Sequence, residues 1–189
     1  MTTASSGSSG DTVVTATTMA GTRTTVVVAV ETTAQDTLAS YPSQLELIVG
    51  TTATSTTAST APQVTTPATI TAQGMVVAVG GSTLIAGKSD GTTITASSVK
   101  NGQPTLQALI GTGKTPATTA KTIFVKVDRV GDVLKTSYST TGKMGSYIGI
   151  ASKRYAKDSL GSSVGVTVRT RGTVAPNSVH VTTSSPLNR

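Results

Sequence analysis

Residues 121–138 carry the pattern that most restricts how this chain can fold. Apolar residues occupy every second position on either side of the pair Gly131–Asp132. Successive side chains of a strand point to opposite faces, so a period of two predicts two strands, each with one apolar face. The Gly-Asp pair between them is typical of a tight hairpin turn. The sequence therefore predicts a β-hairpin with one apolar and one basic, solvated face, in which Ile123, Val125 and Val127 alternate with Phe124, Lys126 and Asp128.

The rest of the chain follows the same pattern, with short strands rich in Thr and Val between turns that contain Gly. About one residue in five is Thr, and no long segment repeats apolar residues at helical spacing. Asp90-Gly91 and Asn101-Gly102 are typical hairpin turns. Residues 111–120 and the charged segment 153–163 are predicted to be loops, and short helical turns are possible at 34–40 and within 153–163. Residues 105–110 are either a strand or a short helix. Strands are predicted at 22–33, 44–49, 70–79, 92–99, 146–152, 164–170 and 178–185.

This spacing of strands and Gly turns predicts an all-β fold, an antiparallel sandwich or jelly-roll-like single domain. Residues 1–12 are rich in Ser, Gly and Thr and are expected to form a flexible N-terminal arm. Residues 13–189 would form the β domain, with a low-complexity connector at about 51–69. One Phe, four Tyr and no Trp leave a core of small aliphatic side chains, so neighbouring copies are expected to add burial.

Few residues are suited to catalysis or to binding a cofactor or metal. The chain has no Cys and a single histidine, His180, which alternates with Val179 and Val181 as on the solvated face of a strand. GTGKT at 111–115 lacks the first Gly of a phosphate loop, and Pro116 follows where a helix should begin. Asp128 and Asp132 are expected to pair with Arg129 or Lys126 rather than to form a catalytic pair. We therefore expect no enzyme activity, no cofactor and no metal.

The charge is unevenly distributed along the chain. Residues 1–87 hold one base against four acids, a net charge of −3, and residues 88–189 hold fourteen bases against four acids, a net charge of +10. Such asymmetry favours contact with a polyanion or with the acidic part of a neighbouring copy. The candidate nucleic-acid or inter-subunit contacts are Lys121, Lys126, Arg129, Lys135, Lys153, Arg154, Lys157, Arg169 and Arg171. Aromatic residues are too few for base stacking, so any nucleic acid would be bound without sequence specificity.

The first twelve residues have neither a positive nor an apolar region, so no secretory signal is predicted. The longest apolar run, Val26–Val30, is too short to span a bilayer, and no membrane partner is expected. In composition, length and strand rhythm the chain resembles small virion structural proteins, namely coat, decoration and tail proteins of viruses, including phages. This resemblance implies a structural protein of the virion, made in the host cytoplasm.

Residues 124–143, FVKVDRVGDVLKTSYSTTGK, are similar to the paired strands of concanavalin-like (laminin-G-like) sandwiches. The Trp that often follows in that pattern is replaced here by Met144. Two functions remain open on this basis. The first is a capsid coat protein that self-assembles in many copies, with its basic C-terminal half facing nucleic acid or an acidic neighbouring surface. The alternative is a capsid decoration, tail or carbohydrate-binding β-sandwich module that acts as a discrete binding unit.

Overall fold

The computed structural model describes residues 12–31, 45–51, 73–80, 84–85, 88–89, 93–100, 103–114, 122–170 and 178–184. Every regular element within these ranges is a β-strand, which confirms the all-β class. The same ranges contain no helix that is long and apolar enough to cross a membrane. The arm up to residue 11, the segment 34–40, the connector beyond Thr51 and the turns at 90–91 and 101–102 lie outside the described residues.

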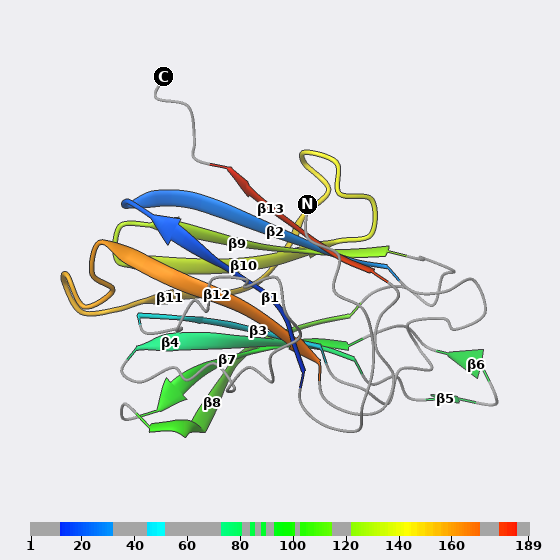
Figure 1. Cartoon of the computed structure of the whole chain (residues 1–189). Coiled ribbons are helices and arrows are strands. Elements are labelled where there is room, and N and C mark those ends of the chain that lie inside the picture. Colours follow the sequence, from blue (N-terminus) through cyan, green and yellow to red (C-terminus); the bar gives the residue numbers. More distant parts are fainter. Residues whose placement is uncertain are drawn as a thin grey trace.

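The strands form two stacked antiparallel sheets, so the predicted sandwich is confirmed (Figure 1). The six-stranded sheet has the order β1 (Thr12–Ala20), β12 (Ser163–Thr170), β3 (Leu45–Gly50), β4 (Gly74–Val79), β7 (Thr93–Lys100) and β8 (Gln103–Lys114). The five-stranded sheet has the order β11 (Ile148–Arg154), β10 (Val133–Ser139), β9 (Thr122–Val130), β2 (Arg23–Glu31) and β13 (Ser178–Ser184). A small pair joins β5 (Leu84–Ile85) to β6 (Lys88–Ser89).

Several sequence expectations need correction. Strand β1 is not among the predicted strands, although Val13, Val14 and the threonines around them are β-branched. Residues 105–110, for which the sequence allows a strand or a short helix, belong to strand β8. The loop expected at 153–163 starts later, because β11 runs to Arg154, and it contains turns and no helix.

The core lies between the sheets and is built from the inward-facing residues of each strand. In β9, buried and half-buried residues alternate as the period of two predicts, and Ile123, Val125 and Val127 are fully buried. Gly131 supplies the positive φ, 59°, that the tight turn to β10 needs. The opposite sheet contributes a similar aliphatic layer. Its fully or almost fully buried members include Met19, Leu47, Val49, Met75, Val77, Ile94, Ala96, Val164, Val166 and Val168.

One edge of the sandwich is closed by direct contact between β8 and β11. A Cβ atom built on Gly111 would lie 2.0 Å from the carbonyl oxygen of Ile150, and one on Gly113 would lie 2.6 Å from the ring of Tyr138. The Tyr138 hydroxyl donates a hydrogen bond to the Lys114 carbonyl at 2.6 Å. The glycines of the GTGKT segment therefore allow two strands to approach closely, and residues 111–114 are a strand rather than the loop expected from the sequence.

One end of the sandwich is held by hydrogen bonds between three turns. The Gly131 amide donates to the Thr22 carbonyl at 2.6 Å, and the Gly21 amide donates to the Ser162 carbonyl at 3.0 Å. The amides of Tyr155 and Asp158 donate to the main-chain carbonyl and to Oδ1 of Asp132, at 2.8 and 3.1 Å. These bonds fix the turn 131–132 between the turn 21–22 and the loop 155–162.

Tyr155 makes the stability of the fold depend on pH. Its buried hydroxyl donates to the Gly74 carbonyl at 2.8 Å, and burial raises its pKa above the ordinary value for tyrosine. Because the folded state holds this proton more tightly, its contribution to stability is complete below about pH 10 and is lost as the pH rises beyond it. We expect the free energy of unfolding, measured by urea titration, to fall by up to about 1.4 kcal/mol per pH unit from this group.

The variant Tyr155→Phe provides the control for this expectation. It should lower stability at pH 7 by about 1 kcal/mol, because the Gly74 carbonyl loses its donor. It should also have a shallower fall in stability above pH 10 than the wild type. Equal slopes in the two proteins would exclude Tyr155 as the responsible group.

Candidate functional site

The outer surface of the five-stranded sheet gathers polar side chains from four neighbouring strands. The alternation that sends aliphatic residues of β2, β9, β10 and β11 into the core sends their neighbours outward. Along one row of this surface, Thr25 pairs with Asp128, Asp128 with Lys135, and Lys135 with Ser152. We call the part of this surface around Asp128 the polar face; it consists of Thr25, Lys126, Asp128 and Ser137.

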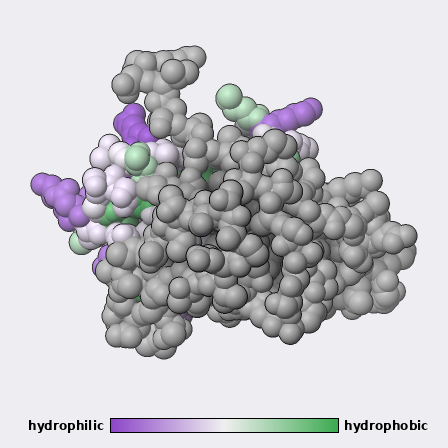
Figure 2. Space-filling view, viewed as in Figure 1, coloured by the Kyte–Doolittle hydropathy of each residue, from purple (hydrophilic) through white to green (hydrophobic). Residues whose placement is uncertain are grey.

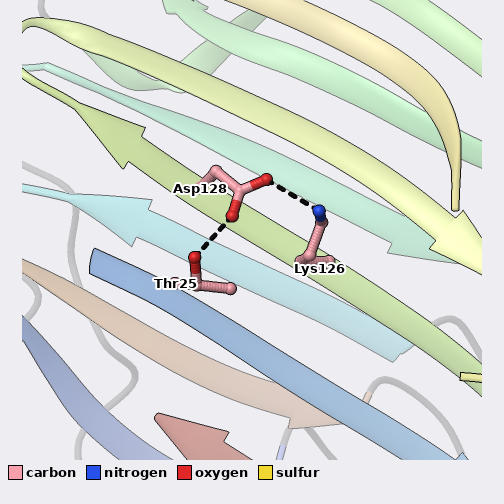
Figure 3. Close-up of polar contacts among 3 residues, drawn as sticks. All are labelled: Thr25, Lys126 and Asp128. Atoms are coloured by element: carbon pink, nitrogen blue, oxygen red, sulfur yellow. Dashed lines mark hydrogen bonds and ion pairs between the residues drawn. The ribbon is translucent and has the colours of Figure 1, made fainter. Parts of the chain in front are cut away.

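Asp128 organises the centre of the polar face. Its carboxylate accepts a hydrogen bond from the Thr25 hydroxyl at 2.6 Å and forms an ion pair with Lys126 Nζ at 3.1 Å (Figure 3). The three side chains come from β2 and β9 and turn toward one another. The expected pairing of Asp128 with Lys126 is therefore confirmed. Among the described residues Asp132 forms no ion pair with a base, and its carboxylate accepts a hydrogen bond from the Asp158 amide.

Tyr147 places an aromatic ring beside this cluster. The Lys126 ammonium lies 4.9 Å from the ring centroid, a distance suited to a cation–π contact. Burial raises the pKa of Tyr147, Lys126 lowers it and Asp128 raises it. The loop that leads to Tyr147 is held by Ser139, whose hydroxyl accepts hydrogen bonds from the Thr141 and Gly142 amides at 3.0 and 2.9 Å. The ring thus stands on an ordered loop beside two charged groups.

A pocket of about 760 Å³ adjoins the polar face at the end where the turns 21–22 and 131–132 meet. Three bases line it, Arg23, Lys135 and Arg154, together with one acid, Asp132. The other lining residues are Thr22, Val130, Gly131, Val133 and Ser152. This end of the molecule lies on the left in Figure 1, and Figure 2 shows hydrophilic residues projecting from the surface on that side. The pocket therefore combines positive charge with two aliphatic side chains.

The candidate contact residues from the sequence are dispersed in the structure. Lys135 and Arg154 line the pocket, and Lys126 lies on the polar face. Lys157 is exposed on the loop 155–162, and the half-buried Lys153 lies 5.8 Å from the ring of Tyr155. Arg169 belongs to β12 of the other sheet, where its Cα pairs with that of Glu46. Lys121 and Arg171 lie outside the described residues.

Arg129 differs most from expectation, because it is buried with 3% of its surface exposed. Its Nε donates to the Gly131 carbonyl at 3.1 Å and its Nη2 to the Gly161 carbonyl, while Nη1 has no hydrogen-bond partner among the described residues. It therefore links the turn 131–132 to the loop 155–162 and is not available to an external partner. Conversely, Arg23 lines the pocket although it lies in the acidic part of the sequence.

The polar groups of this site differ from those of a metal centre. Among the described residues there is no group of three or more His, Cys, Asp or Glu side chains close enough to hold an ion. Asp128 is engaged with Thr25 and Lys126. His180 lies in β13 opposite Ala29. The arrangement offers hydroxyls, one carboxylate, cationic groups and an aromatic ring, which are groups that bind a polar ligand by hydrogen bonds and charge.

Comparison with known proteins supports the fold and does not identify a function. No protein-family model matches the chain, and no curated protein matches its sequence. A functionally unknown protein from Saccharomyces cerevisiae is similar in structure, with a TM-score of 0.50 and 11% identity, over 92% of this chain and 74% of that chain. A GH43 glycoside hydrolase engineered to display endo-xylanase and exo-arabinofuranosidase activity gives a TM-score of 0.51 and 8% identity.

The second likeness covers 88% of this chain but 30% of the hydrolase, so this chain spans under a third of that protein. The carbohydrate-binding module CBM66 from Bacillus subtilis has a TM-score of 0.44 and 11% identity, over 97% of this chain and 88% of that chain. The first two likenesses support a shared β-sandwich fold. They give no support to the capsid shell expected from composition.

Proposed function

We propose that this chain is a discrete, non-catalytic carbohydrate-binding module that holds its ligand on the polar face. The observation that carries the proposal is the cluster of Thr25, Asp128 and Lys126 beside the ring of Tyr147. Sugar hydroxyls both donate and accept hydrogen bonds, so a carboxylate and an ammonium side by side can bind one pair of them. An aromatic ring next to these groups can cover the apolar face of a sugar ring.

The fold is compatible with this role, since a similar sandwich occupies part of a glycoside hydrolase with xylanase activity. A shared fold does not by itself imply a shared function, so the weight of the proposal rests on the polar face. Self-association in many copies, contact with nucleic acid and a place in a virion stay predictions. They are alternatives to the proposed module, because a coat protein would form a very large particle in solution, whereas the module would remain a small species.

The first test measures mass and ligand binding on the same untagged protein. Size-exclusion chromatography with light scattering should give a small species with little absorbance at 260 nm. Affinity electrophoresis in gels that contain soluble neutral or acidic polysaccharides should then retard this species. A very large particle rich in absorbance at 260 nm would contradict the proposal and favour the coat protein. Absence of retardation in every polysaccharide would equally contradict it.

The second test changes the centre of the polar face. Asp128→Asn keeps the size of the side chain but removes the charge that holds Thr25 and Lys126. We expect affinity for the retarding polysaccharide to fall by about tenfold, which corresponds to about 1.4 kcal/mol. Thr95→Ala, a half-buried position on β7 of the other sheet, is the control and should leave affinity unchanged. Equal losses in the two variants would exclude the polar face as the binding surface.

A further inference from the structure

The pocket beside the polar face contains unpaired positive charge. Arg23, Lys135 and Arg154 all line it, and none of them has an ion-pair partner among the described residues. The single acid of the pocket, Asp132, is held by main-chain donors through its carboxylate and its carbonyl. The bases are thus left to face solvent together. Three cations that share a concave surface favour the binding of an anionic group.

The strand register shows how these bases are arranged. Arg23 pairs with Val130, Val130 with Val133, and Val133 with Arg154, so the four residues form one row across four strands. Neighbouring strands lie about 4.8 Å apart, which places the two arginine Cα atoms roughly 14 Å apart. Lys135 lies on the same side of the sheet as Arg154, two residues beyond Val133. Val130 and Val133 therefore lie between Arg23 on one side and Arg154 and Lys135 on the other. We call these two residues the aliphatic strip.

The aliphatic strip is partly open to solvent. Val130 has 44% of its surface exposed, and it lies in phase with the outward-facing residues of β9, Phe124, Lys126 and Asp128, which are half buried. A sugar ring that carries an acidic group matches this strip and its flanking bases, because the ring has an apolar face of C–H groups and a charged substituent at its edge. Arginine is suited to such a substituent, since its planar fork binds a carboxylate or sulfate through two hydrogen bonds.

We infer that this pocket is an anion subsite, which binds the carboxylate or sulfate of a sugar residue, so that the ligand of the module is an acidic polysaccharide. The inference rests on the proposed carbohydrate-binding function and gives it a ligand class. The pocket volume of about 760 Å³ is in the range of small-ligand sites, which suits one or two sugar residues. None of the described lining residues is aromatic, so the pocket offers no stacking platform to a nucleic-acid base.

Isothermal titration calorimetry with four probes of equal length tests the inference. The probes are a galacturonate oligosaccharide, a sulfated galactose oligosaccharide, a neutral galactose oligosaccharide and a single-stranded oligonucleotide. We expect at least one acidic oligosaccharide to bind about tenfold more tightly than the neutral one, and the comparison between the two acidic probes identifies the anion. This preference should shrink as the salt concentration rises. Tighter binding of the oligonucleotide than of either acidic sugar would overturn the assignment to a glycan.

Charge-neutral variants locate the subsite. Arg154→Gln and Lys135→Gln should each reduce affinity for the acidic oligosaccharide about tenfold and leave affinity for the neutral one unchanged. Lys157→Gln makes the same change of charge at an exposed position outside the pocket and should have less than about a twofold effect. Circular dichroism verifies that every variant is folded.

The two proposals fail in different ways. If the neutral sugar binds as tightly as the acidic ones while Asp128→Asn still weakens binding, the anion subsite is excluded and the carbohydrate-binding function stands. If the pocket variants behave like Lys157→Gln, the subsite is excluded as well. If no saccharide binds at all, the proposed function and the subsite are both excluded.

Discussion

Replacing Gly111 by alanine is expected to lower the free energy of unfolding by about 3 kcal/mol. The added Cβ would lie 2.0 Å from the Ile150 carbonyl oxygen and 3.0 Å from the Ala151 Cβ, far inside van der Waals contact. Both obstacles belong to β11, and a main-chain carbonyl cannot move aside as a flexible side chain does. The strands β8 and β11 must therefore separate, which weakens the closed edge of the sandwich. Such a loss is large compared with a typical total stability of about 5–15 kcal/mol.

Gly149→Ala is the matched control on the opposing strand. A Cβ at Gly149 would meet nothing within 4 Å, and the residue is exposed. This variant should be neutral, or more stable by up to about 1 kcal/mol, because alanine has less freedom than glycine in the unfolded chain. Urea unfolding followed by far-ultraviolet circular dichroism measures both variants, since the chain has no Trp to report by fluorescence. Similar stabilities for the two variants would refute close packing at Gly111.

The second large effect is expected at Arg129. Arg129→Met retains a long apolar side chain but removes the donors to the carbonyls of Gly131 and Gly161. Each hydrogen bond from a charged donor contributes about 1.5–3 kcal/mol, and the buried charge with its unpartnered Nη1 opposes part of this gain. We therefore expect a net loss of about 2–4 kcal/mol, measured by urea unfolding. The loop 155–162 should also exchange its amide hydrogens faster.

Lys153→Met is the control for this prediction. It removes a cation from the same end of the sheet but leaves both hydrogen bonds of Arg129 in place. Lys153 lies in the same sheet, opposite Leu134, and is half buried. Its replacement should change stability by less than about 0.5 kcal/mol. A stable Arg129→Met protein with normal exchange in the loop would show that the two carbonyls do not depend on the guanidinium.

The hairpin shows how far local patterns predict this fold. The alternation from Ile123 to Tyr138 and the turn at Gly131 determine both faces, and the structure confirms them. The same alternation also places Arg129 in phase with the buried Val127. Its charge suggests the surface, whereas its phase predicts the interior. The phase predicts the position of Arg129 correctly, because the Gly131 and Gly161 carbonyls accept hydrogen bonds from two of its five N–H groups.

The candidate site could be predicted only in part, since it depends on pairing between distant segments. Lys135 and Asp128 belong to one hairpin, and their common face follows from the sequence. Arg23 and Thr25 join them because β2 pairs with β9, about 100 residues away, and no local pattern specifies that pairing. The charge asymmetry along the chain even separates Arg23 from the other bases of the pocket. The charge distribution along the sequence therefore indicated the positive charge of the pocket and two of its bases, Lys135 and Arg154, but missed Arg23.

The pairing of the outer strands also determines when this fold can form during synthesis. Strand β1 pairs with β12, and β2 lies between β9 and β13, so the earliest described strands wait for partners made roughly 100 to 150 residues later. During synthesis, β9 and β10 can pair as soon as both have left the ribosome, because they are adjacent in the sequence. By contrast, β1 and β2 leave the exit tunnel with exposed edges and no strand to pair with. Nascent chains of this protein should therefore be vulnerable to aggregation until the strands near residues 163–184 emerge.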